Sequence, residues 1–286
     1  MAHGEASGPL NRDLRAPGDP KGASSGYPSS VSEPFWRTGI GRVRPGEILV
    51  RGYDLTELIG NRSFGDVAYL LLSGDLPTGN EGRMMDALLV AAAEHSMVAP
   101  SVDAARFAGS AGVPLQAAVA AGTVAMGEYH GGAVDAAARA FLDADRTGLP
   151  DPEAAAAVCR RLREEGSRLP GFGHVVHDPD PRAPRLFEVA GDLGLRERWC
   201  GLAEAFEAAA EEVFGRPLRM NVDGAMAALL LDLGLDPGLG KAFYVIGRSP
   251  GLVAHVFEEQ TRERPYRDVG WENVAYDGPE RRPLPD

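Results

Sequence analysis

Apolar residues recur at three- and four-residue steps over most of the chain after residue 60, a pattern typical of helices that bury one face. Gly74 and Pro77 end the first such run, and Pro152 directly after Asp151 marks the start of a later one. The pattern predicts helices over residues 64–72, 84–97, 114–126, 132–143, 151–166, 202–214, 222–233 and 240–260.

Strand patterns are scarce by comparison. Residues 47–53 form one short extended segment after the turn signal Pro45-Gly46. Residues 1–35 are rich in glycine, proline, serine and charge, and they offer little apolar surface to offset the entropy of ordering. The sequence therefore predicts an all-α fold that follows a flexible N-terminal arm.

Composition narrows the functional class. A net charge of −12 over 286 residues argues against a nucleic-acid partner, because phosphate contacts need a basic face. Cys159 and Cys200 lack metal-ligand or redox spacing, and no disulfide framework is expected. No apolar run is long enough to cross a bilayer. We expect a cytoplasmic protein without a membrane span.

The candidate catalytic residues are concentrated at positions where loops meet predicted helices. His130 precedes Gly131, Gly132 and a predicted helix, and a helix N-terminus disfavours a protonated imidazole. His130 is therefore a candidate neutral hydrogen-bond donor. A packed turn histidine without a chemical role is the alternative interpretation, and taken alone it is favoured.

A glycine-rich loop carries the second candidate. Its members Gly171, Phe172 and Gly173 offer backbone N–H groups that could hold phosphate or carbonyl oxygens, and His174 follows them. His174 and His177, with Asp178 and Asp180, are also possible metal ligands. Their spacing does not match a closed zinc site, so no metal is expected.

Acidic and basic residues complete the set of candidates. Asp223 opens a predicted helix, where it could act as a cap or as a carboxylate that takes a proton from carbon. Arginine forms a fork that suits carboxylates, which makes Arg182, Arg248 and Arg267 candidate substrate ligands. Each of these arginines, taken alone, is more often a surface residue.

The order of these segments carries more information than any one of them. Five segments follow one another along the chain: EHSMVAPS, YHGGAVDAA, PGFGHVVHDPDPRA, MNVDGAMAALLLDLG and GRSPGLVAHVFEE. In the order of these segments the chain resembles the citrate synthase superfamily, from about residue 48 to residue 277. The resemblance implies a homodimer with an active site in a cleft between two helical domains. The large domain would span residues 36–134 and 236–286, and the small domain residues 135–235.

The resemblance also implies roles. His130 would donate a hydrogen bond to a thioester oxygen, Asp223 would exchange a proton with the acetyl methyl group, and His174 would bind the keto oxygen of oxaloacetate. Coenzyme A thioester would be a substrate, with no tightly bound cofactor. Contacts to substrate carboxylates would come from Arg182, Arg248 and Arg267, the last from this subunit or the other, and His95 would be a further substrate contact.

Two departures bear on the direction of the reaction. Gly224 stands where typical synthases carry an aromatic residue, and the ending PYRDVGWENVAY is more similar to citryl-CoA lyases. His130 is retained, as in synthases. We expect reversible cleavage of citryl-CoA to acetyl-CoA and oxaloacetate. The alternatives are a citrate synthase, a condensing enzyme for another 2-oxo acid, a non-catalytic CoA-binding scaffold subunit and a histidine-based metal protein.

Overall fold

A computed structural model of the chain describes residues 35–285. The predicted N-terminal arm, residues 1–35, lies outside the described residues except for its last position. The chain divides into two compact units between residues 61 and 62. The predicted division into residues 135–235 and the rest stays a prediction.

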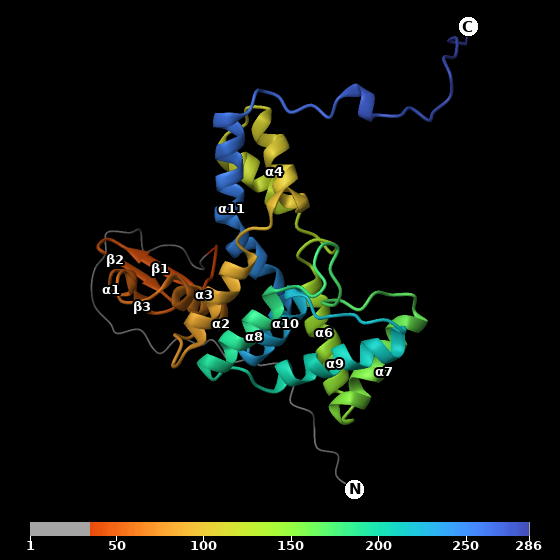
Figure 1. Cartoon of the computed structure of the whole chain (residues 1–286). Helices are drawn as coiled ribbons and strands as arrows, with labels where there is room; N and C mark the ends of the chain where they lie inside the picture. The colour runs from red at the N-terminus through yellow and green to blue at the C-terminus, as the bar shows by residue number, and fades with distance from the viewer. Residues whose placement is uncertain (1–34, 286) are drawn as a thin grey trace. The chain divides into compact units, whose positions relative to one another are not determined.

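The first unit contains a small antiparallel sheet. Its strands are β1 (Gly41–Arg44), β2 (Glu47–Val50) and β3 (Tyr53–Asp54), in the order β1-β2-β3. Gly46 adopts φ +78° in the turn between β1 and β2. The predicted extended segment covers β2 and the start of β3, but it missed β1. A short helix, α1 (Leu55–Leu58), completes the unit (Figure 1).

The described part of the second unit is helical, which confirms the prediction of an all-α fold apart from the small sheet. Short 3-10 turns lie at Ser96–Val98, Pro237–Leu239 and Trp271–Asn273. The helices are α2 (Phe64–Ser73), α3 (Glu81–Ala92), α4 (Pro100–Ser110), α5 (Leu115–Val124), α6 (Ala133–Asp145), α7 (Asp151–Glu164), α8 (Arg182–Leu193), α9 (Arg198–Phe214), α10 (Val222–Asp232) and α11 (Gly240–Arg262).

Helix α10 forms the centre of the main core. Its residues from Gly224 to Leu231 are all buried, and a helix that is apolar on every side is buried on every side. It packs against α6, α8 and α9 (Figure 1). A second, smaller core joins α4, α5 and one end of α11 through Ala99, Val102, Ala105, Ala118, Leu252 and Val256.

The predicted helix over residues 84–97 is wrong in its second half. Helix α3 ends at Ala92, and the chain turns before α4 begins at Pro100. Ser96 adopts φ +55° in this turn, and its N–H is held by the carboxylate of Glu94. The interruption moves His95 off the helix and into a loop.

Two helices of the second unit, α4 and α8, were not predicted at all. Apolar residues of α8 do follow helical spacing, at Ala183, Leu186, Phe187 and Ala190. The sequence DPDP precedes this helix, and proline is compatible with the start of a helix. Arg182 is therefore the first residue of a helix.

Helix α11 crosses α3 at very short range. A Cβ on Gly247 would lie 2.6 Å from the carbonyl oxygen of Leu89, so only glycine permits this approach. The crossing carries the next residue, Arg248, into the interior. Among the residues that the structure describes, no helix is long and apolar enough to span a membrane.

Candidate active site

The glycine-rich loop is fastened to the segment just before α10. The carbonyl oxygen of Gly171 accepts a hydrogen bond from the N–H of Asn221 at 3.0 Å, and the N–H of Gly173 donates to the carbonyl oxygen of Arg219 at 2.7 Å. The side-chain amide of Asn221 also donates to the carbonyl oxygen of Gly173, at 2.6 Å. These bonds hold His174 beside the first turn of α10.

The same contacts bear on the predicted cofactor-binding role of Gly171, Phe172 and Gly173. The Gly173 N–H is already donated to a main-chain carbonyl, so it does not point to a ligand. The Phe172 ring is buried and packs against Phe141 and Phe206, with ring centroids at 6.5 and 6.2 Å. In this structure the three residues shape the loop and the core, and their contact with a cofactor stays a prediction.

Backbone contacts fix the tautomer of His174. Its Nδ1 accepts hydrogen bonds from the N–H groups of Val176 and His177, both at 3.0 Å. A neutral imidazole whose Nδ1 accepts carries its proton on Nε2. Burial lowers the pKa of His174, and the positive charge of Arg182 adds to this effect although Asp180 opposes it. His174 is thus a neutral donor through Nε2.

Arg182 lies beside that donor. Its Nη2 is 3.5 Å from Nε2 of His174, while its Nε and Nη2 donate to the two carboxylate oxygens of Asp180 at 3.0 and 2.9 Å. Asp180 is buried and also accepts the N–H of Val222. Burial alone would raise the pKa of Asp180, but the hydrogen bonds from Arg182 and Val222 lower it. This ion pair holds the guanidinium next to the imidazole.

His130 is positioned by α4. Its Nε2 lies 2.8 Å from the hydroxyl oxygen of Ser101, which is fully buried, and it accepts the N–H of Ser101 at 3.4 Å. An accepting Nε2 leaves the proton on Nδ1. Burial lowers the pKa of His130, and the positive charge of Arg248 lowers it further. His130 is therefore a second neutral donor, through Nδ1.

Asp223 sits in the first turn of α10, where Asn221 caps the helix. The Tyr244 hydroxyl donates a hydrogen bond of 2.5 Å to its Oδ1. Burial raises the pKa of Asp223 above its usual value, although the bond from Tyr244 works in the opposite direction. A carboxylate with a raised pKa is a stronger base, which suits proton abstraction from carbon.

Arg248 is a buried cation with an unused donor. Only 1% of the residue is exposed, and its Nε donates to the carbonyl oxygen of Ala92 at 2.6 Å. Among the described residues, its Nη1 has no hydrogen-bond partner. Its guanidinium lies 5.8 Å from the ring centroid of Tyr244. Because buried polar groups are nearly always satisfied, the vacant donor points to an anionic ligand.

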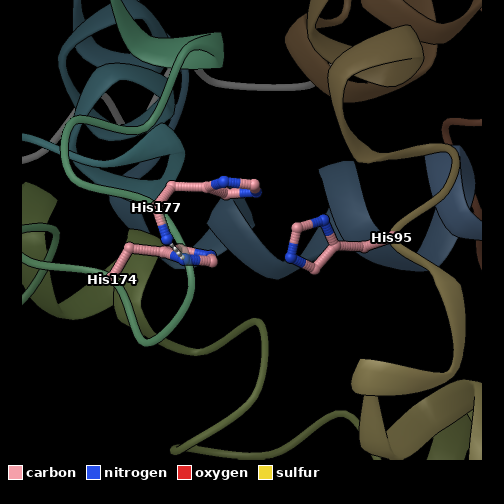
Figure 2. A group of neighbouring side chains, drawn as sticks. All are labelled: His95, His174 and His177. Atoms are coloured by element: carbon pink, nitrogen blue, oxygen red, sulfur yellow. Dashed lines mark hydrogen bonds between the residues drawn. The ribbon is translucent and has the colours of Figure 1, made fainter.

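Three imidazoles meet at the same place. His95 approaches from the turn after α3, and His174 and His177 approach from the loop before α8 (Figure 2). The ring centroid of His95 lies 5.4 Å from that of His174 and 5.6 Å from that of His177. Burial, followed by the charge of Arg182, lowers the pKa of His95 to about 4. His95 is therefore neutral at physiological pH.

The same three imidazoles have the spacing of a metal site, since one ring nitrogen of each lies within 4.8 Å of the others. The tautomer of His174 works against coordination, because a ligating nitrogen must give up its proton. Asp180, another suggested ligand, is engaged by Arg182 instead. The geometry fits hydrogen-bond donation better than metal binding.

Arg267 does not join this cluster within the chain. It follows α11, and its Nε and Nη2 donate to the two carboxylate oxygens of Glu259, at 2.9 and 2.6 Å. The buried Arg106 binds the same carboxylate at 2.7 Å. The predicted substrate contact of Arg267, from this subunit or another, stays a prediction.

Two residues of the site were missed in the sequence. Ser101 lies in the first turn of α4, a helix that was not predicted. Tyr244 precedes Arg248 by four residues, which places both on one face of a helix. That spacing was the available signal for a tyrosine beside the substrate arginine.

A pocket of about 480 Å³ opens next to His174. Its wall combines apolar side chains with two exposed arginines, Arg168 and Arg216. The remaining lining residues are Ser167, Leu169, Phe172, Gly173, Val175, Phe214 and Leu218.

Comparison with known proteins identifies the family of the chain. The family described as "Citrate synthase, C-terminal domain" matches residues 79–268. The structure of citryl-CoA lyase from Hydrogenobacter thermophilus is similar with a TM-score of 0.82 and 40% identity, over 88% of this chain and 98% of that one.

Curated relatives point to the same family. Citrate/2-methylcitrate synthase of Bacillus subtilis (strain 168) is 32% identical over 219 residues, which cover 73% of this chain and 55% of the relative. ATP-citrate synthase beta chain protein 2 of Arabidopsis thaliana is 29% identical over 184 residues, which cover 58% of this chain and 29% of that one. The aligned part thus spans less than a third of the plant protein. The family match covers well over half of the 286 residues of this chain, which therefore belongs to the citrate synthase family.

Proposed function

We propose that the chain catalyses the reversible cleavage of citryl-CoA to acetyl-CoA and oxaloacetate. The observation that carries the proposal is the likeness to a citryl-CoA lyase, at 40% identity over 98% of that enzyme. The vacant Nη1 of Arg248 supports an acidic substrate. The two neutral imidazole donors, His130 and His174, support chemistry at carbonyl oxygens.

In the direction of condensation, Asp223 takes a proton from the methyl carbon of acetyl-CoA. His130 donates from Nδ1 to the thioester oxygen, where negative charge develops as the enolate forms. Preorganised donors of this kind each contribute roughly 3 kcal/mol to the transition state. The enolate carbon then attacks the keto carbon of oxaloacetate. His174 stabilises the developing alkoxide with a hydrogen bond from its Nε2–H, and the alkoxide takes a proton from solvent to become the hydroxyl of citryl-CoA, while Asp223 releases its proton to solvent.

Cleavage reverses each of these steps. The hydroxyl of citryl-CoA loses its proton to solvent while the Nε2–H of His174 stabilises the alkoxide, the carbon–carbon bond breaks, and Asp223, protonated from solvent, gives its proton to the enolate carbon to form acetyl-CoA. Arg182, Arg248 and His95 would hold the carboxylates of the acid. The reaction leaves the thioester intact, so a lyase releases no free coenzyme A.

The pocket beside His174 is our candidate binding site for the phosphate-bearing part of coenzyme A. Arg168 and Arg216 would meet the phosphates, and the apolar wall would cover the less polar parts of the molecule. Coenzyme A would thus enter the site as part of the thioester substrate, and the reaction would need no tightly bound cofactor.

We further propose a homodimer located in the cytoplasm. Helix α5 has only Ala118 and Gly122 buried, although most of its residues are apolar. The segment after α11 exposes Trp271 and Tyr276, at 88% and 78%. Apolar surface of this extent is typical of a protein interface. Light scattering and cell fractionation test the two statements separately.

One assay separates the candidate reactions. Purified protein is incubated with citryl-CoA, and separately with acetyl-CoA and oxaloacetate, while oxaloacetate, free thiol and citrate are followed. Oxaloacetate without free thiol supports the lyase. Citrate with free thiol would show a citrate synthase instead, and no turnover in either direction would favour a non-catalytic CoA-binding subunit.

A further inference from the structure

We propose that Tyr244 is a positioning residue for the base Asp223, and that its hydroxyl fixes the carboxylate so that Oδ2 faces the acetyl carbon. This inference rests on the proposed function. It adds a residue that neither the family match nor the names of the relatives assign.

Contacts of Asp223 show why a positioning group is needed. The backbone N–H of Asp223 is engaged by the capping amide of Asn221, at 2.9 Å, which leaves the side chain free to rotate. Within residues 35–285, Tyr244 is the one side chain that hydrogen-bonds the Asp223 carboxylate. That bond occupies Oδ1 and leaves Oδ2 to exchange the proton.

Tyr244 is itself held firmly. It is 6% exposed and lies on α11, one turn before Arg248. Its ring packs against the turn that carries His130, since a Cβ on Gly131 would lie 3.3 Å from Cγ of Tyr244. The Tyr244 side chain therefore lies against the carboxylate of Asp223, the turn that carries His130, and the guanidinium of Arg248. Phenylalanine would fill the same space but would donate no hydrogen bond.

The phenol is suited to remain a donor. Burial raises the pKa of Tyr244 well above 10, and the neighbouring negative charge of Asp223 raises it further. Tyr244 thus keeps its proton throughout the reaction, and the proton from the acetyl methyl group goes to Oδ2 alone. Because the donated bond stabilises the carboxylate form, it keeps part of the base ionised despite its burial.

Other charged groups also face Asp223. Arg182 at the start of α8 and Arg248 on α11 favour its ionised form, and His174 does so only when its ring is protonated. Asp180 disfavours it. Removing the hydroxyl of Tyr244 leaves all four groups in place, so a change of the pH profile reports on the hydrogen bond.

The test compares Tyr244→Phe with the wild type. Exchange of the acetyl-CoA methyl protons with deuterated solvent and condensation with oxaloacetate are both measured against pH. Both need the carboxylate form of Asp223, whose pKa rises when the donor is lost. We expect kcat to fall about tenfold, KM to change less than threefold, and the acid limb of the profile to move about one unit to higher pH.

Tyr69→Phe is the matched control. Tyr69 is partly buried, and its hydroxyl donates to the carbonyl oxygen of Leu233 at 3.4 Å, away from the Asp223 carboxylate. Its profile should match the wild type. An unshifted acid limb with unchanged kcat in Tyr244→Phe would overturn the role of Tyr244. Absence of exchange and turnover in the wild type would instead refute the proposed function.

A second variant covers the case in which Tyr244→Phe does not fold. 3-Fluorotyrosine placed at position 244 keeps the shape of the side chain but is a stronger donor. The acid limb should then move to lower pH. If the limb stays where it is in the wild type, the inference is wrong.

Discussion

Gly171 and Gly224 approach so closely that a Cβ on Gly171 would lie 2.7 Å from the Cα of Gly224. Gly171 has φ +82°, a conformation that glycine adopts at little cost. The contact seats the loop of His174 on the first turn of α10, where Asp223 lies. It also gives a reason for the glycine at 224, because an aromatic side chain would collide with the loop.

Gly224→Ala should damage both the fold and the activity. The added methyl group would meet the carbonyl oxygen of Gly171 and the side chain of Met220, so the loop must move. We expect a loss of about 2 kcal/mol of stability, seen as a lower Tm. We also expect a kcat for citryl-CoA cleavage at least 100-fold lower, because displacement of a catalytic group by about 1 Å costs that much.

The matched control is Gly191→Ala on α8, where a Cβ would meet nothing within 4 Å. Alanine is favoured over glycine inside a helix, so Tm should stay or rise slightly. Equal effects of the two substitutions would contradict the close contact between Gly171 and Gly224.

Asp223→Asn should separate binding from turnover. The amide keeps the size of the side chain but cannot accept the proton from carbon. We expect kcat to fall about 1,000-fold, with methyl-proton exchange lost to the same extent. Oxaloacetate binding, measured by calorimetry, should remain within a few-fold of wild type. Retained turnover would remove Asp223 from the role of base.

Arg248→Lys tests the vacant donor. Lysine keeps the charge but lacks the planar fork, and its amine cannot reproduce the bond to Ala92 together with a second donor to substrate. The KM for oxaloacetate should rise about 100-fold. Arg185→Lys, on the exposed face of α8, is the control and should leave KM unchanged. A normal KM in Arg248→Lys would show that this arginine does not bind the acid.

Sequence patterns predicted most helices of the core better than the turns between them, although α4 and α8 were missed. Helix α10 is apolar on every side, and α7 begins at a strong start signal, so both were found with nearly the correct ends. The turn at His95 was missed because residues 84–97 read as one helical run. It forms because tertiary contacts, above all the crossing of α11 over α3, outweigh local propensity.

Roles that depend on contacts between distant segments were beyond the sequence. The tautomers of His130 and His174 are set by backbone N–H groups whose positions only the fold provides. Tyr244 was not singled out in the sequence, where it lies inside the predicted helix over residues 240–260. Its hydrogen bond with Asp223 joins residues 21 positions apart, and no local pattern encodes it.

Chelation should leave the enzyme active. The His95, His174 and His177 rings are close enough to hold an ion, but His174 accepts at Nδ1 and keeps its proton on Nε2. Arginines and neutral donors supply the charge that the reaction needs. Protein dialysed against EDTA should retain its kcat within about twofold. Loss of activity that Zn²⁺ restores would assign a metal to these imidazoles.

Stability should fall as the pH is lowered from about 6.5, and His95 should contribute to the fall. Its pKa is about 4 in the folded protein, whereas a histidine in an unfolded chain titrates near 6.5. Between these values the unfolded chain binds more protons than the folded one, so each step down in pH favours unfolding. His95→Gln removes this difference, and the decrease of Tm between pH 7 and pH 4.5 should be smaller than in the wild type. Equal decreases, or an NMR titration of the His95 ring near pH 6.5, would show that the imidazole is not buried beside Arg182 as the structure has it.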